Sequence, residues 1–501
     1  MNYTKRVVAG LGIVFLMRAL GSLFAYLIRL VLARELTPTE YGLFYAVLTM
    51  VIFFIFFRDL GLGQALVKYI PEFQVHKKFD RIKTAIVSVC SFQFLSSLIL
   101  CAAFFFAADY LALNYFKNPD AAVLLKLFIP YILLSIFFII QKSILQGFQR
   151  IAIFSTIEFV KNVGVFFILL LFLGQGLGVF APVLAYVATA FLLILIYIAP
   201  TYHTFNLNKY QIVNLKPITK QMFAFGVPVM FTTVGDNIIS YIDTLMLTYY
   251  TTLENVGIYN VVLPSAVILI TLGTSIAAVL YPLTSELWAR KDTKRLTDGL
   301  RILHRYSFVA IIPIIFTIFA FSQFFIEFFF GPEYVAGTRA LQILLLGVLV
   351  FIVAVINHNI LAGIGRPRDV TKIIFTAALV NTIVNFLLIP LDYTLFGLQI
   401  GGINGAAIAT SLSYLVALIY SMKLIRRHIN VHFPFKDWGK LLIAAAAFIA
   451  VLAFVKEVIS IATWMEIVVS AGIAGIVYLL VVFLLHIIDI SEIKYYLKHA
   501  R

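Results

Sequence analysis

Long apolar runs recur along the whole chain and constrain its fold more than any other feature. Fourteen such runs, separated by charges, Gly or Pro, lie at 7–33, 41–66, 84–108, 121–146, 152–173, 178–200, 221–248, 256–284, 303–330, 336–362, 369–390, 402–425, 438–456 and 464–488. About 20 apolar residues in a helix cross the hydrocarbon core of a bilayer. Only 12% of the residues are charged, about half of what a soluble domain carries. The sequence therefore predicts an all-α polytopic membrane protein with about 14 transmembrane helices.

Basic residues between the runs predict the topology. With the N-terminus in the cytoplasm, 29 of the 38 Lys and Arg residues fall in cytoplasmic segments, and the outer loops hold only four: Arg34, Lys117, Arg339 and Lys456. Cytoplasmic loops of membrane proteins are enriched in Lys and Arg. We therefore expect an even number of spans in the plasma membrane, with both termini cytoplasmic. These loops account for the net charge of +15, so no nucleic-acid partner is expected.

The chain also repeats itself at an offset of 215 or 216 residues. The segment ILQGFQR at 144–150 recurs as ILAGIGR at 360–366, and Gly42 is matched by Gly257. Six spans per copy is an even number, so the two copies share one orientation, as in transporters whose substrate path lies between repeats. The predicted domains are an N-terminal six-helix lobe (1–220), a C-terminal six-helix lobe (221–428), and two additional helices with a cytoplasmic tail (429–501).

Arginines within the predicted spans indicate an anionic substrate. Arg18 and Arg29 are eleven residues apart, about 20° from eclipsed on a helix, and their span contains no acidic residue. Each buried charge costs about 2.5–3.5 kcal/mol at the bilayer centre, so these side chains should face a cavity. Guanidinium groups bind phosphate through charge-assisted, often bidentate contacts. Arg18 and Arg29, with Arg58 at the inner end of the second span, are predicted to bind the phosphate of a substrate.

Other charged residues in the spans have possible partners close in sequence. Asp59 adjoins Arg58, and Glu158 lies three residues before Lys161, on one helical face. Structural ion pairs and functional roles are equally open for Asp59, Glu158 and Lys161. Lys126 is expected to extend its ammonium group to a span end.

The second copy carries oxygen ligands instead of arginines. Carboxylate, amide and hydroxyl oxygens suit a hard cation such as Na⁺, and a carboxylate alone can carry H⁺. The alternative is that the amides and hydroxyls join neighbouring helices. No other metal or cofactor is predicted. The candidate cation site consists of Asp236, Asp243, Asn381, Asn385 and Thr410.

No catalytic motif competes with transport, and the chain is not expected to be an enzyme. The sequence contains no HExxH, Asp-x-Asp or Gly-x-Ser-x-Gly pattern. Gly439-Lys440 is not a Walker A motif, because Pro434 and Leu441 replace its first Gly and its Ser or Thr. The segments between the apolar runs are also too short for a separate catalytic domain.

Several motifs resemble a known family. The stretch RELTPTEYGLFYAVLTMVIFFIFFRDLGLGQALVKYIPE (34–72) resembles the opening of polysaccharide transporters in the multidrug/oligosaccharidyl-lipid/polysaccharide (MOP) exporter superfamily. FGPEYVAG (330–337), ILAGIGRPRD (360–369) and GINGAAIATSLSYL (402–415) are similar to later motifs of that family. The resemblance extends through the twelfth span.

The resemblance implies a flippase that moves a polyprenyl-(pyro)phosphate-linked oligosaccharide from the cytoplasmic to the outer leaflet by alternating access. It places Arg18, Arg29 and Arg58 in the cationic first-lobe cavity of the family. The related lipid II flippases hold sodium on spans seven, eleven and twelve, where Asp236, Asn381, Asn385 and Thr410 stand here. An Asn takes the place of an expected second carboxylate, so coupling to Na⁺ or H⁺ stays open. The protein is expected to be a monomer. Its expected partners are the lipid-linked glycan, the lipid bilayer and the enzymes that assemble the glycan.

Three other functions are possible for a membrane protein of this kind. A multidrug or cation antiporter of the same fold would need an anionic first-lobe cavity, whereas this lobe carries arginines. A membrane glycosyltransferase or polymerase would need a large loop with catalytic carboxylates. A scaffold without transport would leave the buried arginines unexplained.

Overall fold

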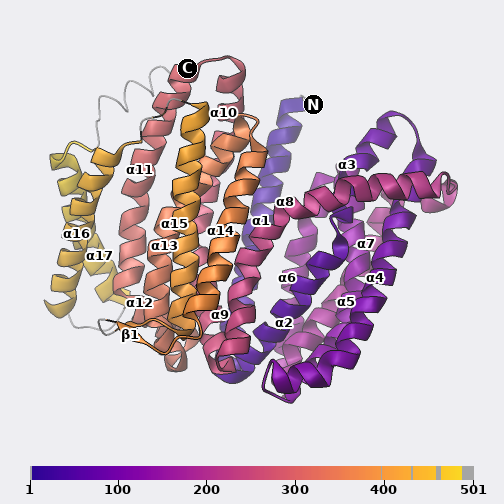
Figure 1. Ribbon diagram of the computed structural model, residues 1–501, viewed down its shortest axis with the longest axis horizontal. Coiled ribbons are helices and arrows are strands. Elements are labelled where there is room, and N and C mark those ends of the chain that lie inside the picture. The colour runs from indigo at the N-terminus through magenta and orange to yellow at the C-terminus, as the bar shows by residue number, and fades with distance from the viewer. Residues whose placement is uncertain (1–2, 396–397, 430, 432, 459–463, 488–501) are drawn as a thin grey trace. The chain divides into compact units, whose positions relative to one another are not determined.

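The computed structural model describes residues 3–395, 398–429, 431, 433–458 and 464–487, and it is helical almost throughout (Figure 1). The chain divides into two compact units, Met1–Val261 and Val262–Arg501. Among the described residues, 13 helices are long and apolar enough to cross a membrane. The all-α polytopic fold is thus confirmed, and the number of 14 spans stays a prediction.

The first unit begins with seven helices and ends with two more that the prediction assigned to the second lobe. Its elements are α1 (Tyr3–Glu35), α2 (Pro38–Asp59), α3 (Leu62–Val75), α4 (Phe79–Asn114), α5 (Asp120–Gly147), α6 (Ile151–Gly174), α7 (Phe180–Thr204), the 3-10 turn η1 (Leu207–Lys209), α8 (Leu215–Tyr250) and the start of α9 (Leu253–Val267). The lobe boundary at residue 220 stays a prediction, and the two compact units divide after Val261. The reason is that α8 packs along α2, α3 and α4.

The predicted run 41–66 is divided between two helices. A capping box between Thr37 and Glu40 starts α2, where the Thr hydroxyl and the Glu carboxylate satisfy free N–H groups. Leu60 and Gly61 then have positive φ of 48° and 70°, which stops the helix. The sequence remains apolar across this break, so hydropathy alone could not locate it.

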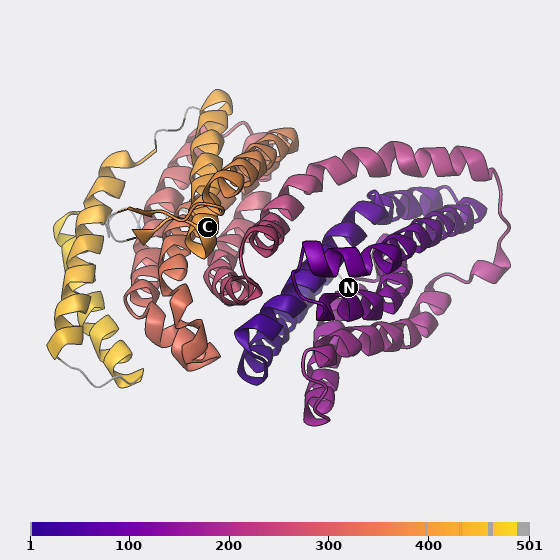
Figure 2. The ribbon, with the colours of Figure 1, turned by 60° about the horizontal axis from the view of Figure 1, so that its bottom comes forward.

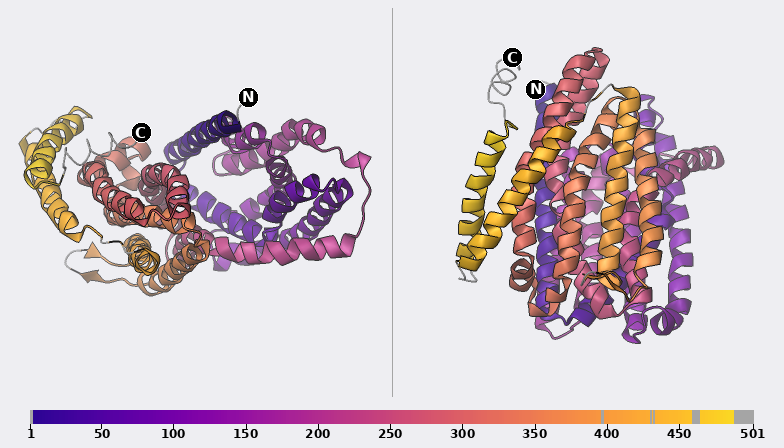
Figure 3. Two further views of the ribbon diagram at one scale, coloured as in Figure 1. Left: turned by 90° about the horizontal axis from the view of Figure 1, so that it is seen from above. Right: turned by 60° about the vertical axis from the view of Figure 1, so that its left-hand side comes forward.

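The first half of α8 lies across the other helices of its unit (Figures 1 and 3). Figure 2 shows the same helix curving, and it contains Gly226 and Pro228, residue types at which long helices bend. Its Met222 packs on an apolar cluster that includes Leu66 of α3 and Ile82 of α4. The close packing of these side chains holds α3 and the first half of α8 together at one end of the unit.

The two copies of the repeated segment have the same backbone geometry. After α5, the Gln149 and Arg150 amides donate to Gln146 (2.9 Å) and Leu145 (2.9 Å), and Gln149 has φ 57°. After α13 (Thr338–Gly363), Gly365 and Arg366 donate to the carbonyls of Ala362 (3.0 Å) and Leu361 (2.8 Å), and Gly365 has φ 79°. Both are Schellman caps. This agreement supports the repeat, which remains a prediction.

The second unit holds the remaining helices and a short antiparallel strand pair. Its elements are α10 (Ile270–Ala289), α11 (Thr293–Ala320), α12 (Ser322–Phe330), the 3-10 turn η2 (Pro332–Gly337), α13, α14 (Pro367–Leu388), β1 (Thr394–Leu395), β2 (Leu398–Gln399), α15 (Gly402–His428), α16 (Phe435–Val458) and α17 (Trp464–Leu484). The predicted run 256–284 falls on α9 and α10, which Ile268 and Leu269 separate, and run 303–330 falls on α11 and α12. At this break the Leu269 amide donates to Ala266 at 3.2 Å and the Thr271 amide to Ile268 at 3.1 Å, so tighter i→i−3 bonds replace the α-helical ones.

The additional helices α16 and α17 pack against α11 (Figure 3). The Trp438 indole N–H donates to the His304 carbonyl at 3.2 Å, and the Tyr478 hydroxyl donates to the Val309 carbonyl at 3.1 Å. Phe448 of α16 is completely buried in an apolar cluster that also contains Tyr478 of α17 and Ile312 of α11. The predicted cytoplasmic tail after residue 487 lies outside the described residues.

Candidate functional site

Arg29 lies among aromatic rings of the first unit. Its guanidinium carbon is 4.4 Å from the ring centre of Tyr45 on α2, and its Nη1 donates to the Asn260 carbonyl on α9 at 2.9 Å. A cation over an aromatic face contributes about 0.5–2 kcal/mol, more where water is excluded. These two contacts fix the orientation of the Arg29 guanidinium group.

Arg18 is on the same helix in a different environment. The side chain is exposed, and within the described part of the chain it has neither a hydrogen bond nor an ion pair. Eleven residues, or about 16 Å of helix, separate it from Arg29. The two arginines therefore share a helix but cannot bind one phosphate group together.

Glu158 on α6 binds two lysines. Its carboxylate is 2.6 Å from Lys161 of the same helix and 2.9 Å from Lys142 on α5. The contact with Lys161 is the one that their spacing suggested. Lys142 was assigned to a loop, whereas it lies in α5, five residues before the helix end at Gly147. The contact forms because α6 packs back against α5, which spacing along the chain does not show.

Aromatic rings of three helices pack beside one another in the same unit. The ring centres of Tyr131 on α5 and Tyr186 on α7 are 5.8 Å apart, and those of Tyr186 and Phe44 on α2 are 6.2 Å apart. The sequence analysis missed these tyrosines, since nothing in an apolar run separates them from ordinary core residues.

We call Arg29, Lys142, Glu158 and Lys161 the cationic cluster. It contains three cations and one anion, so it is net positive. Glu158 keeps 46% and Lys161 23% of the side chain exposed. Partly exposed cations are suited to binding an anion with several oxygens.

Arg58 is buried between helices. Its Nη1 donates to Ser97 (3.1 Å), the Ile132 carbonyl (2.9 Å) and Ser135 (3.1 Å). Its neighbour Asp59 instead accepts from Gln93 at 2.5 Å. The suggested contact pair between Arg58 and Asp59 is not formed, because adjacent residues of a helix face different neighbours. A phosphate contact by Arg58 stays a prediction.

The two aspartates of α8 differ sharply. Asp236 is exposed, and its carboxylate has no partner among the described residues; Ser240 donates to its backbone carbonyl at 2.7 Å. Asp243 is only 1% exposed and accepts a hydrogen bond from the Tyr259 hydroxyl at 2.5 Å. Asp243 is thus engaged with α9, while Asp236 is available to a ligand.

The other predicted cation ligands are buried in the second unit. The Asn381 amide donates to Thr410 at 3.2 Å, joining α14 to α15, and Asn385 lies one turn further along α14. The structure brings these three together on two helices. Asp236 and Asp243 belong to the first unit, so a site that combines all five residues stays a prediction.

The second unit also contains a polar chain that the sequence analysis missed. His304 Nε2 is 2.6 Å from the Asn357 amide oxygen, and the Asn357 amide donates to Ser421 at 2.9 Å. All three side chains are buried. They join α11, α13 and α15, whose separation in sequence gave no signal for this contact.

The comparisons with known proteins identify the family. The family model described as "Polysaccharide biosynthesis protein" matches residues 7–288, more than half of the chain. The chain belongs to this family. A second model, MatE, matches residues 228–387. The resemblance seen in the sequence is therefore confirmed, and this polysaccharide biosynthesis protein is a multi-pass member of the MOP superfamily.

Two relatives cover most of the chain. "Uncharacterized membrane protein MJ1068" of Methanocaldococcus jannaschii is 30% identical over 99% of this chain and 98% of its own length. "Probable low-salt glycan biosynthesis flippase Agl15" of Haloferax volcanii is 21% identical over 89% of each chain.

Solved structures show the same fold. The lipid II flippase MurJ in an inward closed conformation matches with a TM-score of 0.72 and 19% identity, covering 99% of this chain and 100% of that one. An inward-facing multidrug resistance MATE transporter of the MOP superfamily matches with a TM-score of 0.67 and 15% identity, covering 84% and 98%. These proteins are named as flippases and transporters, and none of these names is that of an enzyme.

Proposed function

We propose that this protein moves a polyprenyl-(pyro)phosphate-linked oligosaccharide from the cytoplasmic to the outer leaflet of the cell membrane by alternating access. The family, the relative named as a glycan biosynthesis flippase, and the fold shared with a lipid II flippase support this class of substrate. In this proposal the protein acts as a monomer beside the enzymes that assemble the glycan.

The exposed guanidinium of Arg18 carries the proposal. It is a permanent charge on a predicted transmembrane helix and has no partner within the described residues. A charge in that position costs several kcal/mol unless water or an anion solvates it. A phosphate group offers the oxygens that the planar guanidinium fork binds in a bidentate way.

The cationic cluster gives the phosphate a second binding place. Arg29 is already oriented by Tyr45 and Asn260, so little side-chain entropy is lost when an anion binds. Since Arg18 and Arg29 are about three helical turns apart, a phosphate contacts them in succession as it moves along α1. Arg58 contributes from the inner end of α2 in this proposal, because its Nε and Nη2 lack partners among the described residues.

Cation coupling is the second part of the proposal. Asp243, Asn381, Asn385 and Thr410, the other residues of the predicted cation site, are buried, whereas the carboxylate of Asp236 is exposed and available to a cation. Na⁺ or H⁺ bound there would favour one conformation over the other, provided that its affinity differs between them.

Export of cationic drugs is less well supported. A cation would have to approach Arg18 and a cluster with three positive side chains and one negative one. Like charges in a site of low dielectric repel strongly, so the electrostatics of this unit favour an anion.

The test is a complementation assay in a strain that lacks the flippase. Arg18→Ala and Arg29→Ala are expected to abolish glycan export at normal abundance in the membrane, while Lys at either position restores it in part because the charge remains. Arg427→Ala, which removes an exposed arginine from the last turn of α15, is the matched control. Full export by both alanine variants would overturn the proposal.

A further inference from the structure

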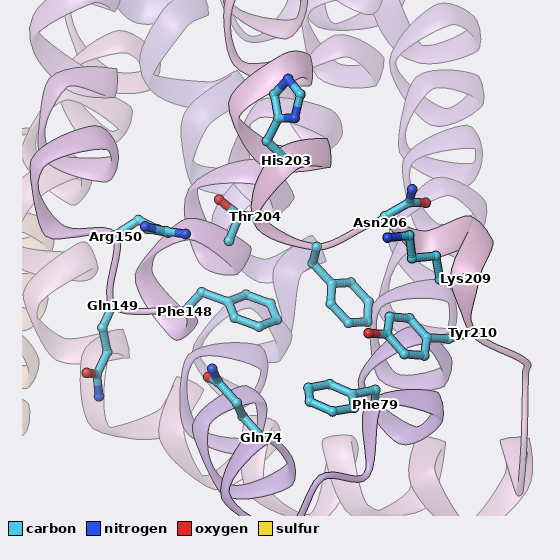
Figure 4. A pocket seen from close by; sticks show the side chains of 11 residues that line it. Gln74, Phe79, Phe148, Gln149, Arg150, His203, Thr204, Asn206, Lys209 and Tyr210 are labelled. Atoms are coloured by element: carbon cyan, nitrogen blue, oxygen red, sulfur yellow. The ribbon is translucent and has the colours of Figure 1, made fainter.

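A polar cavity lies at one end of the first unit. Its volume is about 510 Å³, within the range of small-molecule sites. It is formed by the α3–α4 turn, the α5–α6 connection and the segment between α7 and α8 (Figure 4). All three connections are ones that the charge pattern predicts to be cytoplasmic. The lining residues are Gln74, Phe79, Phe148, Gln149, Arg150, His203, Thr204, Phe205, Asn206, Lys209 and Tyr210.

A column of four aromatic rings forms one wall of this cavity. The ring centres of Phe148 and Phe205 are 5.3 Å apart, those of Phe205 and Tyr210 5.0 Å, and those of Tyr210 and Phe79 5.4 Å. The planes of each pair differ by at most 27°. Because the inner rings stack on one another, their faces are not available to a ligand.

Backbone contacts fasten the same segment in place. The Gln211 amide donates to Asp80 at 2.8 Å and the Val213 amide to Thr84 at 2.9 Å, while Lys83 donates to the Tyr210 carbonyl at 2.6 Å. The Schellman cap after α5 fixes Arg150 on the other side. The cavity walls are thus preformed, which reduces the entropy lost on binding.

The charge of the cavity is uniformly positive. Arg150 and Lys209 point into it from opposite sides (Figure 4). Both side chains are exposed and, in the part of the chain that the structure describes, neither has an ion pair. No acidic residue lines the cavity, and the remaining polar groups are three amides, two hydroxyls and an imidazole. Clefts lined by one sign of charge concentrate ions of the opposite sign.

We infer that this cavity binds a phosphate-bearing ligand, with its phosphate oxygens between Arg150 and Lys209. A guanidinium and an ammonium on opposite sides match a group with oxygens on several faces. The amide side chains donate hydrogen bonds to the remainder of the ligand, which the volume has room for. The ligand is either the headgroup of an anionic lipid or a soluble phosphate ester, and the inference does not depend on the proposed transport.

The test uses the full-length protein in nanodiscs of neutral phosphatidylcholine, with calorimetric titration of sodium pyrophosphate. The pocket variant R150Q/K209Q is compared with K216Q/K220Q, which removes the same charge from exposed lysines at the start of α8 in the same unit. We expect binding to weaken by about tenfold or more in the pocket variant only, since it loses both charge-assisted contacts to the phosphate oxygens. In parallel, the native protein and both variants are extracted from nanodiscs that contain phosphatidylglycerol. Native mass spectrometry then measures how much of this lipid stays bound to each.

The outcomes separate the two sources. Selective loss of pyrophosphate binding indicates a soluble phosphate ester. Absence of pyrophosphate binding, with phosphatidylglycerol retained by the native protein and by K216Q/K220Q but not by R150Q/K209Q, indicates a lipid headgroup. If neither ligand distinguishes the two variants, the cavity is not a phosphate site and the inference is wrong.

Discussion

Gly42 and Gly257 lie against each other in the first unit, although 215 residues separate them in the sequence. A Cβ atom added to Gly42 would lie 2.7 Å from the Gly257 nitrogen and would overlap the Leu253 carbonyl oxygen. A Cβ atom added to Gly257 would lie 3.1 Å from the Gly42 nitrogen. The two glycines are also equivalent positions of the predicted repeat. The repeat itself stays a prediction.

The glycine contact predicts a steric effect on stability. Gly42→Ala is expected to destabilise the protein by about 1–3 kcal/mol, because the added methyl group meets backbone atoms that cannot move aside easily. The measurement is the melting temperature of the purified protein in detergent. Gly299→Ala is the control, since nothing lies within 4 Å of its Cβ position on α11 and Ala favours helix by up to about 1 kcal/mol. Equal melting temperatures for the native protein and Gly42→Ala would refute the close contact.

The group of Glu158, Lys142 and Lys161 predicts an electrostatic effect. Glu158→Gln leaves two partly buried lysines beside each other, and we expect a loss of about 1 kcal/mol, reduced from the value for buried pairs because all three side chains are partly exposed. Asp109→Asn breaks a more exposed pair with Lys126 at 3.0 Å and is expected to change little. Thermal unfolding at low and high salt measures both variants. Equal effects of the two substitutions would show that Glu158 is an ordinary surface group.

The two aspartates of α8 are expected to respond differently to the same substitution. Asp236→Asn should keep the native melting temperature and abolish any dependence of transport on Na⁺ or H⁺, because its carboxylate has no protein partner among the described residues. Asp243→Asn should lower the melting temperature, because it weakens the buried hydrogen bond from Tyr259. Transport in reconstituted vesicles with and without an ion gradient measures the first effect. Unchanged ion dependence in Asp236→Asn would remove the cation-site proposal.

The charge pattern predicts the topology of the loops. Single cysteines at Lys77 and Arg290 should react with a membrane-impermeant maleimide only after the cells are opened, whereas those at Asn118 and Glu333 should react in intact cells. The background for this labelling is a variant in which Cys90 and Cys101 are replaced by Ala. Reaction of positions 77 and 118 on the same side would contradict the predicted arrangement.

Most helices could be located from the sequence, and some of their breaks could not. An apolar segment in lipid must satisfy its own backbone hydrogen bonds, so length and hydropathy nearly suffice to find it. The breaks at Leu60 and at Ile268 lie inside apolar runs, where they leave hydropathy unchanged. They depend on local backbone geometry that hydropathy does not encode.

Some contacts of the candidate site could likewise be predicted from the sequence, and others could not. Glu158 and Lys161 could be paired from their spacing, because positions three apart share a helical face whatever surrounds the helix. The contact of Lys142 with Glu158 required α5 to fold back on α6, and the Asp243–Tyr259 bond required α8 to meet α9. Arg58 and Asp59 adjoin in the chain, yet each binds residues of other helices.

The sequence by itself determined the membrane class, the helices, the family resemblance and the excess of positive charge in the first lobe. These properties depend on composition and on distances along one helix. Only the tertiary structure decided how each charge is held: Arg18 and Asp236 are exposed without partners among the described residues, whereas Nη1 of Arg58 and the carboxylate of Asp243 are held in buried hydrogen bonds. The physical reason is that solvation and pairing of a charge are set by neighbouring helices, which the chain brings together from positions far apart.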